Sequence, residues 1–201
     1  MILSTTVVLV ISGLTILFGA LSRTEALRPL FSTLGLGSLV DEPISRRMIA
    51  GALGGILGGI LSAVWVWVIQ RQEIIGSTSL CIPGSGCVAA LSQGSSNNLP
   101  FTGLEFGLFF ILLFSILGWI ALTLHLDPKA SNALRLLSWG RILSGAGTAV
   151  AVWMTIIHLA FVDDSPAICP VCLVLLVANI VTFAQFHLLY TSHSNGSWND
   201  K

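Results

Sequence analysis

The chain has 201 residues, of which 54% are hydrophobic and only 9% are charged, and its formal net charge is zero. An average soluble domain carries about 25% charged residues, so this composition excludes an ordinary soluble protein, and the absence of net positive charge argues against nucleic-acid binding. Too little polar sequence remains for a separate soluble catalytic domain of roughly 50 residues or more. Any chemistry must therefore take place inside or beside a membrane.

Five apolar runs are long enough, at about 20 residues, to cross a hydrocarbon core of about 30 Å. In chain order they are 2–21, 48–70, 104–124, 136–161 and 169–190. The first run ends in small residues, as a cleaved signal peptide does, but it lacks the basic residues that open such peptides. We expect it to be retained as a membrane helix.

The placement of lysine and arginine predicts the orientation, because these residues accumulate in loops on the cytoplasmic side. Alternating the five spans puts nearly all of them on one side: Arg23, Arg28, Arg46, Arg47, Lys129, Arg135, Arg141 and Lys201. Arg71 is the exception. We therefore expect the N-terminus outside and the C-terminus inside, with segments 71–103 and 162–168 facing outward.

All four cysteines then lie on the outer side, where an oxidising compartment permits reversible thiol chemistry. Cys169 and Cys172 form a CxxC motif with Pro170 at the start of the last span. This spacing places both sulfurs on one side of a first helical turn, where unpaired amides and the helix dipole lower a thiol pKa, and proline is well tolerated there. A zinc site or a structural disulfide is the alternative, but His158 is the nearest histidine in the sequence and zinc normally takes four ligands.

Cys81 and Cys87 form the second pair, and the residues between them include Pro83, Gly84 and Gly86. Such residues permit tight turns and segmental motion, which favours a mobile pair that shuttles electrons, although a static loop-closing disulfide has the same spacing. Exchange proceeds by thiolate attack through mixed disulfides. Two pairs on one face can therefore relay electrons from a soluble partner to a buried acceptor.

These motifs together resemble the vitamin K epoxide reductase family, whose bacterial members reoxidise periplasmic thioredoxin-like proteins. The resemblance covers about residues 45–190. It consists of a span, an outer loop with two spaced cysteines and a serine, Leu99-Pro100 with Gly103 before the next span, a third span, and a CxxC that opens the fourth. The other type of bacterial disulfide-bond oxidase carries its CxxC after the first span of the bundle, which argues against that family.

The resemblance implies an all-α integral membrane protein with a four-helix transmembrane bundle over residues 45–190, including the outer loop 71–103. Residues 1–44 would add one N-terminal transmembrane helix and a cytoplasmic loop, and residues 191–201 a polar cytoplasmic tail. The protein is expected in the bacterial inner membrane, with its active site on the periplasmic face.

The family also implies a role for each cysteine. Cys172 resembles the cysteine that engages the quinone, Cys169 the one that resolves it by pairing with Cys87, and Cys81 the one that exchanges with the partner. Ser92 resembles the hydroxyl residue of the family. The implied electron acceptor is a quinone of the ubiquinone, menaquinone or phylloquinone type. The implied partner is a soluble or anchored thioredoxin-fold (DsbA-like) protein.

Two other functions remain open at this point. Vitamin K epoxide reduction is disfavoured, because Leu176 occupies the position of a tyrosine found in members that reduce vitamin K. A cysteine-based soft-metal carrier is the non-enzymatic alternative. Asn179 and His158 are further candidates for quinone contact, although Asn179 has a simpler use in a hydrogen bond between helices and His158 as an interfacial residue.

Overall fold

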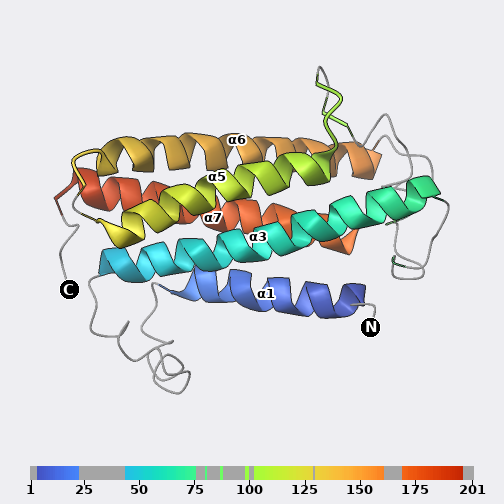
Figure 1. Ribbon diagram of the computed structural model, residues 1–201, viewed down its shortest axis with the longest axis horizontal. Helices are drawn as coiled ribbons and strands as arrows, with labels where there is room; N and C mark the ends of the chain where they lie inside the picture. The colour runs from blue at the N-terminus through green and yellow to red at the C-terminus, as the bar shows by residue number, and fades with distance from the viewer. Residues whose placement is uncertain are drawn as a thin grey trace.

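A computed structural model of the chain describes residues 4–22, 44–75, 80, 87, 98–99, 102–128, 130–160 and 169–196. The fold is all-α, as predicted, and Figure 1 shows helices lying roughly parallel along one long axis. The five helices of the described residues are α1 (Thr5–Leu21), α3 (Ile44–Ile75), α5 (Phe106–Leu126), α6 (Ala133–Ala160) and α7 (Pro170–Ser194).

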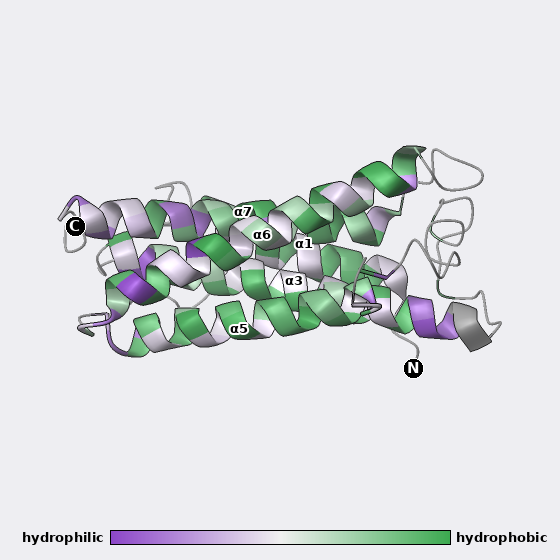
Figure 2. Cartoon of the chain, turned by 90° about the horizontal axis from the view of Figure 1, so that it is seen from above, coloured by the Kyte–Doolittle hydropathy of each residue, from purple (hydrophilic) through white to green (hydrophobic). Residues whose placement is uncertain are grey.

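Four of these helices are long and apolar enough to cross a membrane: Ile44–Gln72 within α3, and the whole of α5, α6 and α7. Figure 2 shows apolar residues along the helices and polar residues gathered toward their ends. The chain is thus an integral membrane protein by length and composition. Helix α1 is also apolar but has 17 residues, fewer than the predicted run of 2–21, because the Ser4 side chain caps it by accepting a hydrogen bond from the Val7 amide.

The four long helices form a closed ring in which α3 contacts α5, α5 contacts α6, α6 contacts α7 and α7 contacts α3. Helix α1 packs outside this ring against α3 and α7. Consecutive helices run in opposite directions, so the start of α1, the end of α3, the start of α5, the end of α6 and the start of α7 share one end of the bundle (Figure 1). We call this the CxxC end.

Glycines of α3 allow the close approach of its neighbours, as the small-residue spacing of this segment predicts. A Cβ atom at Gly58 would lie 2.9 Å from the Ser12 carbonyl oxygen of α1, and one at Gly59 would lie 2.4 Å from the Phe114 ring of α5. A Cβ at Gly55 would lie 3.1 Å from the Thr182 hydroxyl of α7. These glycines of α3 therefore serve the packing of helices within one chain.

Replacing Gly58 by alanine is expected to lower the free energy of unfolding by about 1–3 kcal/mol, because the added methyl group has no room between α3 and α1. Reversible unfolding in mixed detergent micelles measures the change. Gly13→Ala in α1 is the matched control, since a Cβ there meets no atom within 4 Å. Equal destabilisation by the two substitutions would contradict the packing described.

Polar side chains also hold α1 in place at both ends. At the CxxC end, the Trp65 Nε1 group donates to the Thr5 hydroxyl at 3.0 Å, and that hydroxyl donates to the Leu80 carbonyl, one residue before Cys81. At the other end, the buried Gln185 side chain donates to the Gly19 carbonyl at 2.8 Å. Helix α1 is thereby connected to α3, α7 and the start of the cysteine-containing loop.

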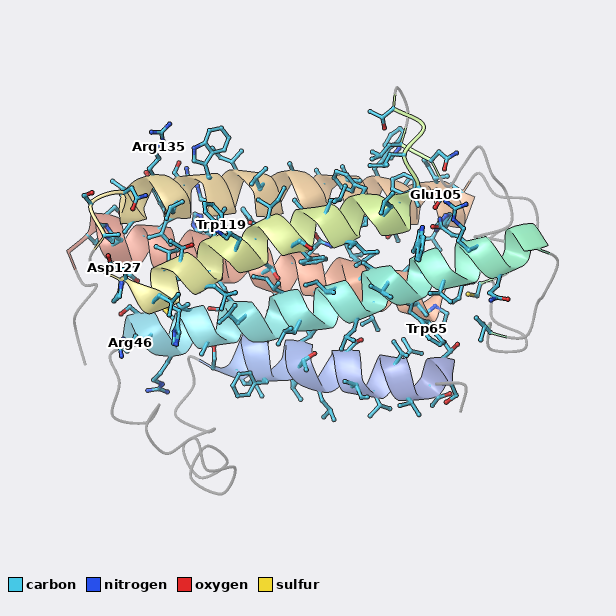
Figure 3. The ribbon with its side chains drawn as sticks, viewed as in Figure 1. Arg46, Trp65, Glu105, Trp119, Asp127 and Arg135 are labelled. Carbon is cyan, nitrogen blue, oxygen red and sulfur yellow. The ribbon has the colours of Figure 1, made fainter. Side chains whose placement is uncertain are left out.

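Charged residues lie at both ends of the bundle. Figure 3 shows Arg46, Asp127 and Arg135 at the end opposite to Trp65 and Glu105. At the CxxC end, Arg71 lies 3.1 Å from the Glu105 carboxylate. Arg71 was the exception in the predicted distribution of basic residues, and this ion pair neutralises its charge.

Candidate functional site

The CxxC motif lies at the start of α7, as predicted. Cys169 is the N-cap residue with extended backbone angles, Pro170 is the first helical residue, and the Cys169 carbonyl accepts from the Leu173 amide at 3.1 Å. Proline is suited to this position because a first-turn residue has no intrahelical acceptor for its amide. The motif therefore places the Cys172 side chain within the first turn, beside Cys169.

Cys87 lies far from Cys169 in the sequence but next to it in the structure. The two sulfur atoms are 3.6 Å apart, and both residues are buried, with 1% and 3% of their surface exposed. A disulfide would require the sulfurs to approach to about 2.05 Å. Cys172 is only partly buried. The structure thus brings three of the four cysteines together at the CxxC end.

The acidity of the Cys169 thiol is shifted by its neighbours in this cluster. A hydrogen bond with the Cys172 side chain, followed by one with Cys87, lowers the pKa of Cys169 well below its usual value. Electrostatic interaction with His158 acts in the same direction, whereas burial opposes it. A thiolate is the reactive form in thiol–disulfide exchange, so the cluster makes Cys169 a good nucleophile.

Replacing Cys172 by alanine is expected to raise the pKa of Cys169, because it removes the largest of these stabilising interactions. Conversion of Cys169 to a mixed disulfide by a small methanethiosulfonate reagent, followed by mass spectrometry across a pH series, gives the midpoint pH of the thiol's reactivity. We expect the midpoint to move to higher pH. The control is Leu173→Ala, at a residue that is 41% exposed. An unchanged midpoint in the Cys172 variant would show that the thiol pair does not set the acidity of Cys169.

Cys172 also lines a small cavity inside the ring of four helices. The cavity walls include Val66 of α3, Phe106 and Phe110 of α5, Met154 and His158 of α6, and Cys172 of α7. Its volume is about 20 Å³, enough for a water molecule, whereas cavities that bind a benzene-sized ring measure about 150 Å³. A ring could bind only after the side chains move apart, and the flexible Met154 is suited to such motion.

The apolar lining of this cavity could not be found from the sequence. Phe106 and Phe110 lie one turn apart near the start of α5, and Met154 lies one turn before His158 in α6. Each has the spacing of an ordinary core residue. Only the three-dimensional arrangement shows that they line one cavity together with Cys172.

The other predicted site residues have different outcomes. Cys81 and Ser92 lie outside the described residues. Asn179 is completely buried in α7, but its amide donates at 2.9 Å to the Leu175 carbonyl of the same helix. Leu175 lines the cavity and Asn179 does not, so the asparagine lies one turn deeper in the bundle. His158 is buried and lines the cavity with Cys172.

The segment before α5 contains Leu99 and Gly103, which form part of the family resemblance. The Leu99 amide donates to the Leu104 carbonyl at 2.9 Å, and the Gly103 amide donates to the Leu99 carbonyl at 3.1 Å. Gly103 has a φ of 66°, a backbone conformation that glycine adopts without strain. This turn leads the chain into Phe106 at the cavity.

Within the described part of the chain, no group of three or more histidine, cysteine or acidic residues has the arrangement to hold a metal ion. Comparison with known proteins finds no match among family sequence profiles, curated sequences or solved structures. The functional interpretation therefore depends on the geometry of the cysteine cluster and its cavity.

Proposed function

We propose that the chain is a membrane thiol:quinone oxidoreductase that reoxidises a thioredoxin-fold partner and so drives disulfide-bond formation. The observation that carries this proposal is the position of Cys169. Its sulfur lies 3.6 Å from that of Cys87 and is hydrogen-bonded to Cys172, which lines an apolar cavity. The Cys169 thiol is thus adjacent both to Cys87, which comes from the segment between α3 and α5, and to Cys172 at the cavity.

This arrangement suits a relay of two electrons. A partner would pass its electrons to Cys81 and Cys87, and exchange between Cys87 and Cys169 would transfer them to the CxxC. Oxidation of Cys169 and Cys172 to one disulfide then releases two electrons and two protons, which convert a quinone to a quinol. The lowered pKa of Cys169 supports the exchange step, because exchange requires a thiolate.

The site chemistry fits a lipid-soluble oxidant. The cavity is lined mainly by aromatic and aliphatic side chains between membrane-spanning helices, so a hydrophobic ring could occupy it beside Cys172 once those side chains move apart. The proposal places the CxxC end on the extracytoplasmic face of a bacterial inner membrane. The basic residues Arg46 and Arg135 at the opposite end support that orientation.

The proposal is tested with the fully reduced protein in lipid nanodiscs. Addition of ubiquinone-1 or menadione is expected to convert free thiols to disulfides and to form quinol in equal amounts, as counted by maleimide labelling and by quinone absorbance. A variant with all four cysteines changed to alanine should produce no quinol. Persistence of the free thiols with both quinones would exclude the proposed reaction.

The same preparation separates the two alternatives. A soft-metal carrier would bind copper(I) or zinc through reduced thiols and form no disulfide when quinone is added. Reduction of vitamin K epoxide by a dithiol would instead indicate the second enzymatic reaction. Quinone-dependent thiol oxidation without metal binding supports our proposal.

A further inference from the structure

His158 is a buried polar side chain that the relay described above does not use. It lies in the last turn of α6, is 3% exposed, and lines the cavity together with Cys172. Its Nε2 atom is buried and has no hydrogen-bond partner in the described structure. A buried ring nitrogen without a partner is unfavourable, and such atoms in native proteins commonly indicate a bound molecule or a catalytic role.

The other cavity-lining side chains do not offer a comparable group. Thr155 also lines the cavity, but its hydroxyl donates to the Ala151 carbonyl at 2.9 Å, one turn back in the same helix. Phe106, Phe110 and Met154 are apolar. Within the described cavity wall, His158 is therefore the nitrogen donor available to a molecule that approaches Cys172.

His158 also interacts with Cys169, the first cysteine of the motif. Its ring lies within electrostatic range of Cys169. The imidazole thus lies near the Cys169 thiol and lines the same cavity as Cys172. A ring with two nitrogens in this position can receive a proton at one atom and release one at the other.

We infer that His158 hydrogen-bonds to an oxygen of the quinone and carries a proton to it from the CxxC. This inference rests on the proposed function. The two thiols of Cys169 and Cys172 form one S–S bond and give up two electrons and two protons, and the quinone takes up both to become quinol. His158 transfers one of these protons: its ring gains a proton from the CxxC and gives one up to the quinone oxygen. It is thus a catalytic residue that contacts the substrate.

The test compares His158→Phe, which removes both nitrogens, with His158→Gln, which keeps an N–H donor but cannot carry a proton. Quinone binding is measured with menadione by quenching of tryptophan fluorescence, and turnover with ubiquinone-1. For His158→Phe we expect binding at least tenfold weaker and a kcat at least 100-fold lower, in the range of general acid–base catalysis. For His158→Gln we expect binding within about threefold of wild type but a kcat at least tenfold lower.

Two controls distinguish this role from a purely structural one. His125→Phe changes a histidine in the last turn of α5, at the opposite end of the bundle, and should leave binding and turnover unchanged. Exchange between Cys87 and Cys169 without quinone should stay within about twofold of wild type in the His158 variants, because His158 makes the smallest of the contributions that lower the pKa of Cys169. Loss of that exchange together with a lower melting temperature would show that His158 only supports the fold.

Failure of the proposed function and failure of the inference about His158 give different experimental results. If the wild-type protein forms no disulfide with quinone, the proposed function fails and the role of His158 fails with it. If the wild type is active and His158→Phe matches it in menadione binding and in kcat, only the inference is overturned. Weaker binding and slower turnover with normal thiol exchange support it.

Discussion

Replacement of Cys172 by serine is expected to reduce quinone-dependent turnover at least 100-fold. A serine hydroxyl is a far weaker acid than a thiol and cannot form a disulfide with Cys169. Because Cys87 lies 3.6 Å from Cys169, the variant should instead accumulate the Cys87–Cys169 disulfide when an oxidised thioredoxin-fold protein is supplied. Quinol formation and mass spectrometry of the disulfide-linked peptides measure the two effects.

The matched control for this variant is Leu176→Ser, which introduces the same side chain one turn further along α7. It should retain most of the wild-type turnover, since Leu176 lies outside the cavity wall. Retained turnover in the Cys172 variant would refute the assignment of Cys172 as the sulfur that faces the quinone. The relay would then have to end at a different cysteine.

The second large effect concerns disulfide formation between chosen pairs of cysteines. A Cys81→Ala/Cys172→Ala variant keeps only Cys87 and Cys169, and a mild oxidant should close this pair rapidly and completely, because the sulfurs are already in contact. A Cys81→Ala/Cys169→Ala variant keeps Cys87 and Cys172, and we expect it to close at least tenfold more slowly. Gel shifts after maleimide labelling give the two rates.

Equal rates of closure in the two variants would contradict the described cluster. That result would mean that Cys87 reaches both cysteines of the motif equally well. Closure of neither pair would show that Cys87 lies away from the start of α7. The fold of each variant is checked by helix content and melting temperature before the rates are compared.

Hydropathy predicted each of the five helices of the described residues but not their ends. The run 48–70 became a helix over Ile44–Ile75, and the run 169–190 became a helix over Pro170–Ser194. A hydropathy window detects the part of a helix that lies in hydrocarbon, whereas the backbone hydrogen bonds continue through polar residues beyond it. Ser45, Arg46 and Arg47 thus belong to α3 although they are polar.

The candidate site was predictable where local sequence determines geometry. The CxxC spacing and Pro170 predicted a helix start with two adjacent thiols, and the structure has that arrangement. The contact between Cys87 and Cys169 joins residues 82 positions apart, and the resemblance rather than the spacing suggested it. Phe106 and Met154 look like ordinary core residues, so no sequence signal distinguishes a cavity wall from a packed interior.

The attachment of α1 has a consequence for processing of the chain. Removal of residues 1–22 would expose a furrow along α3 at Gly54 and Gly58, where no side chain fills the space that α1 occupies. The Gln185 amide would lose its acceptor, the Gly19 carbonyl, and would face lipid unpaired, at a cost of several kcal/mol. A shortened chain would therefore need lipid tails or another helix to fill the furrow before the bundle could be stable.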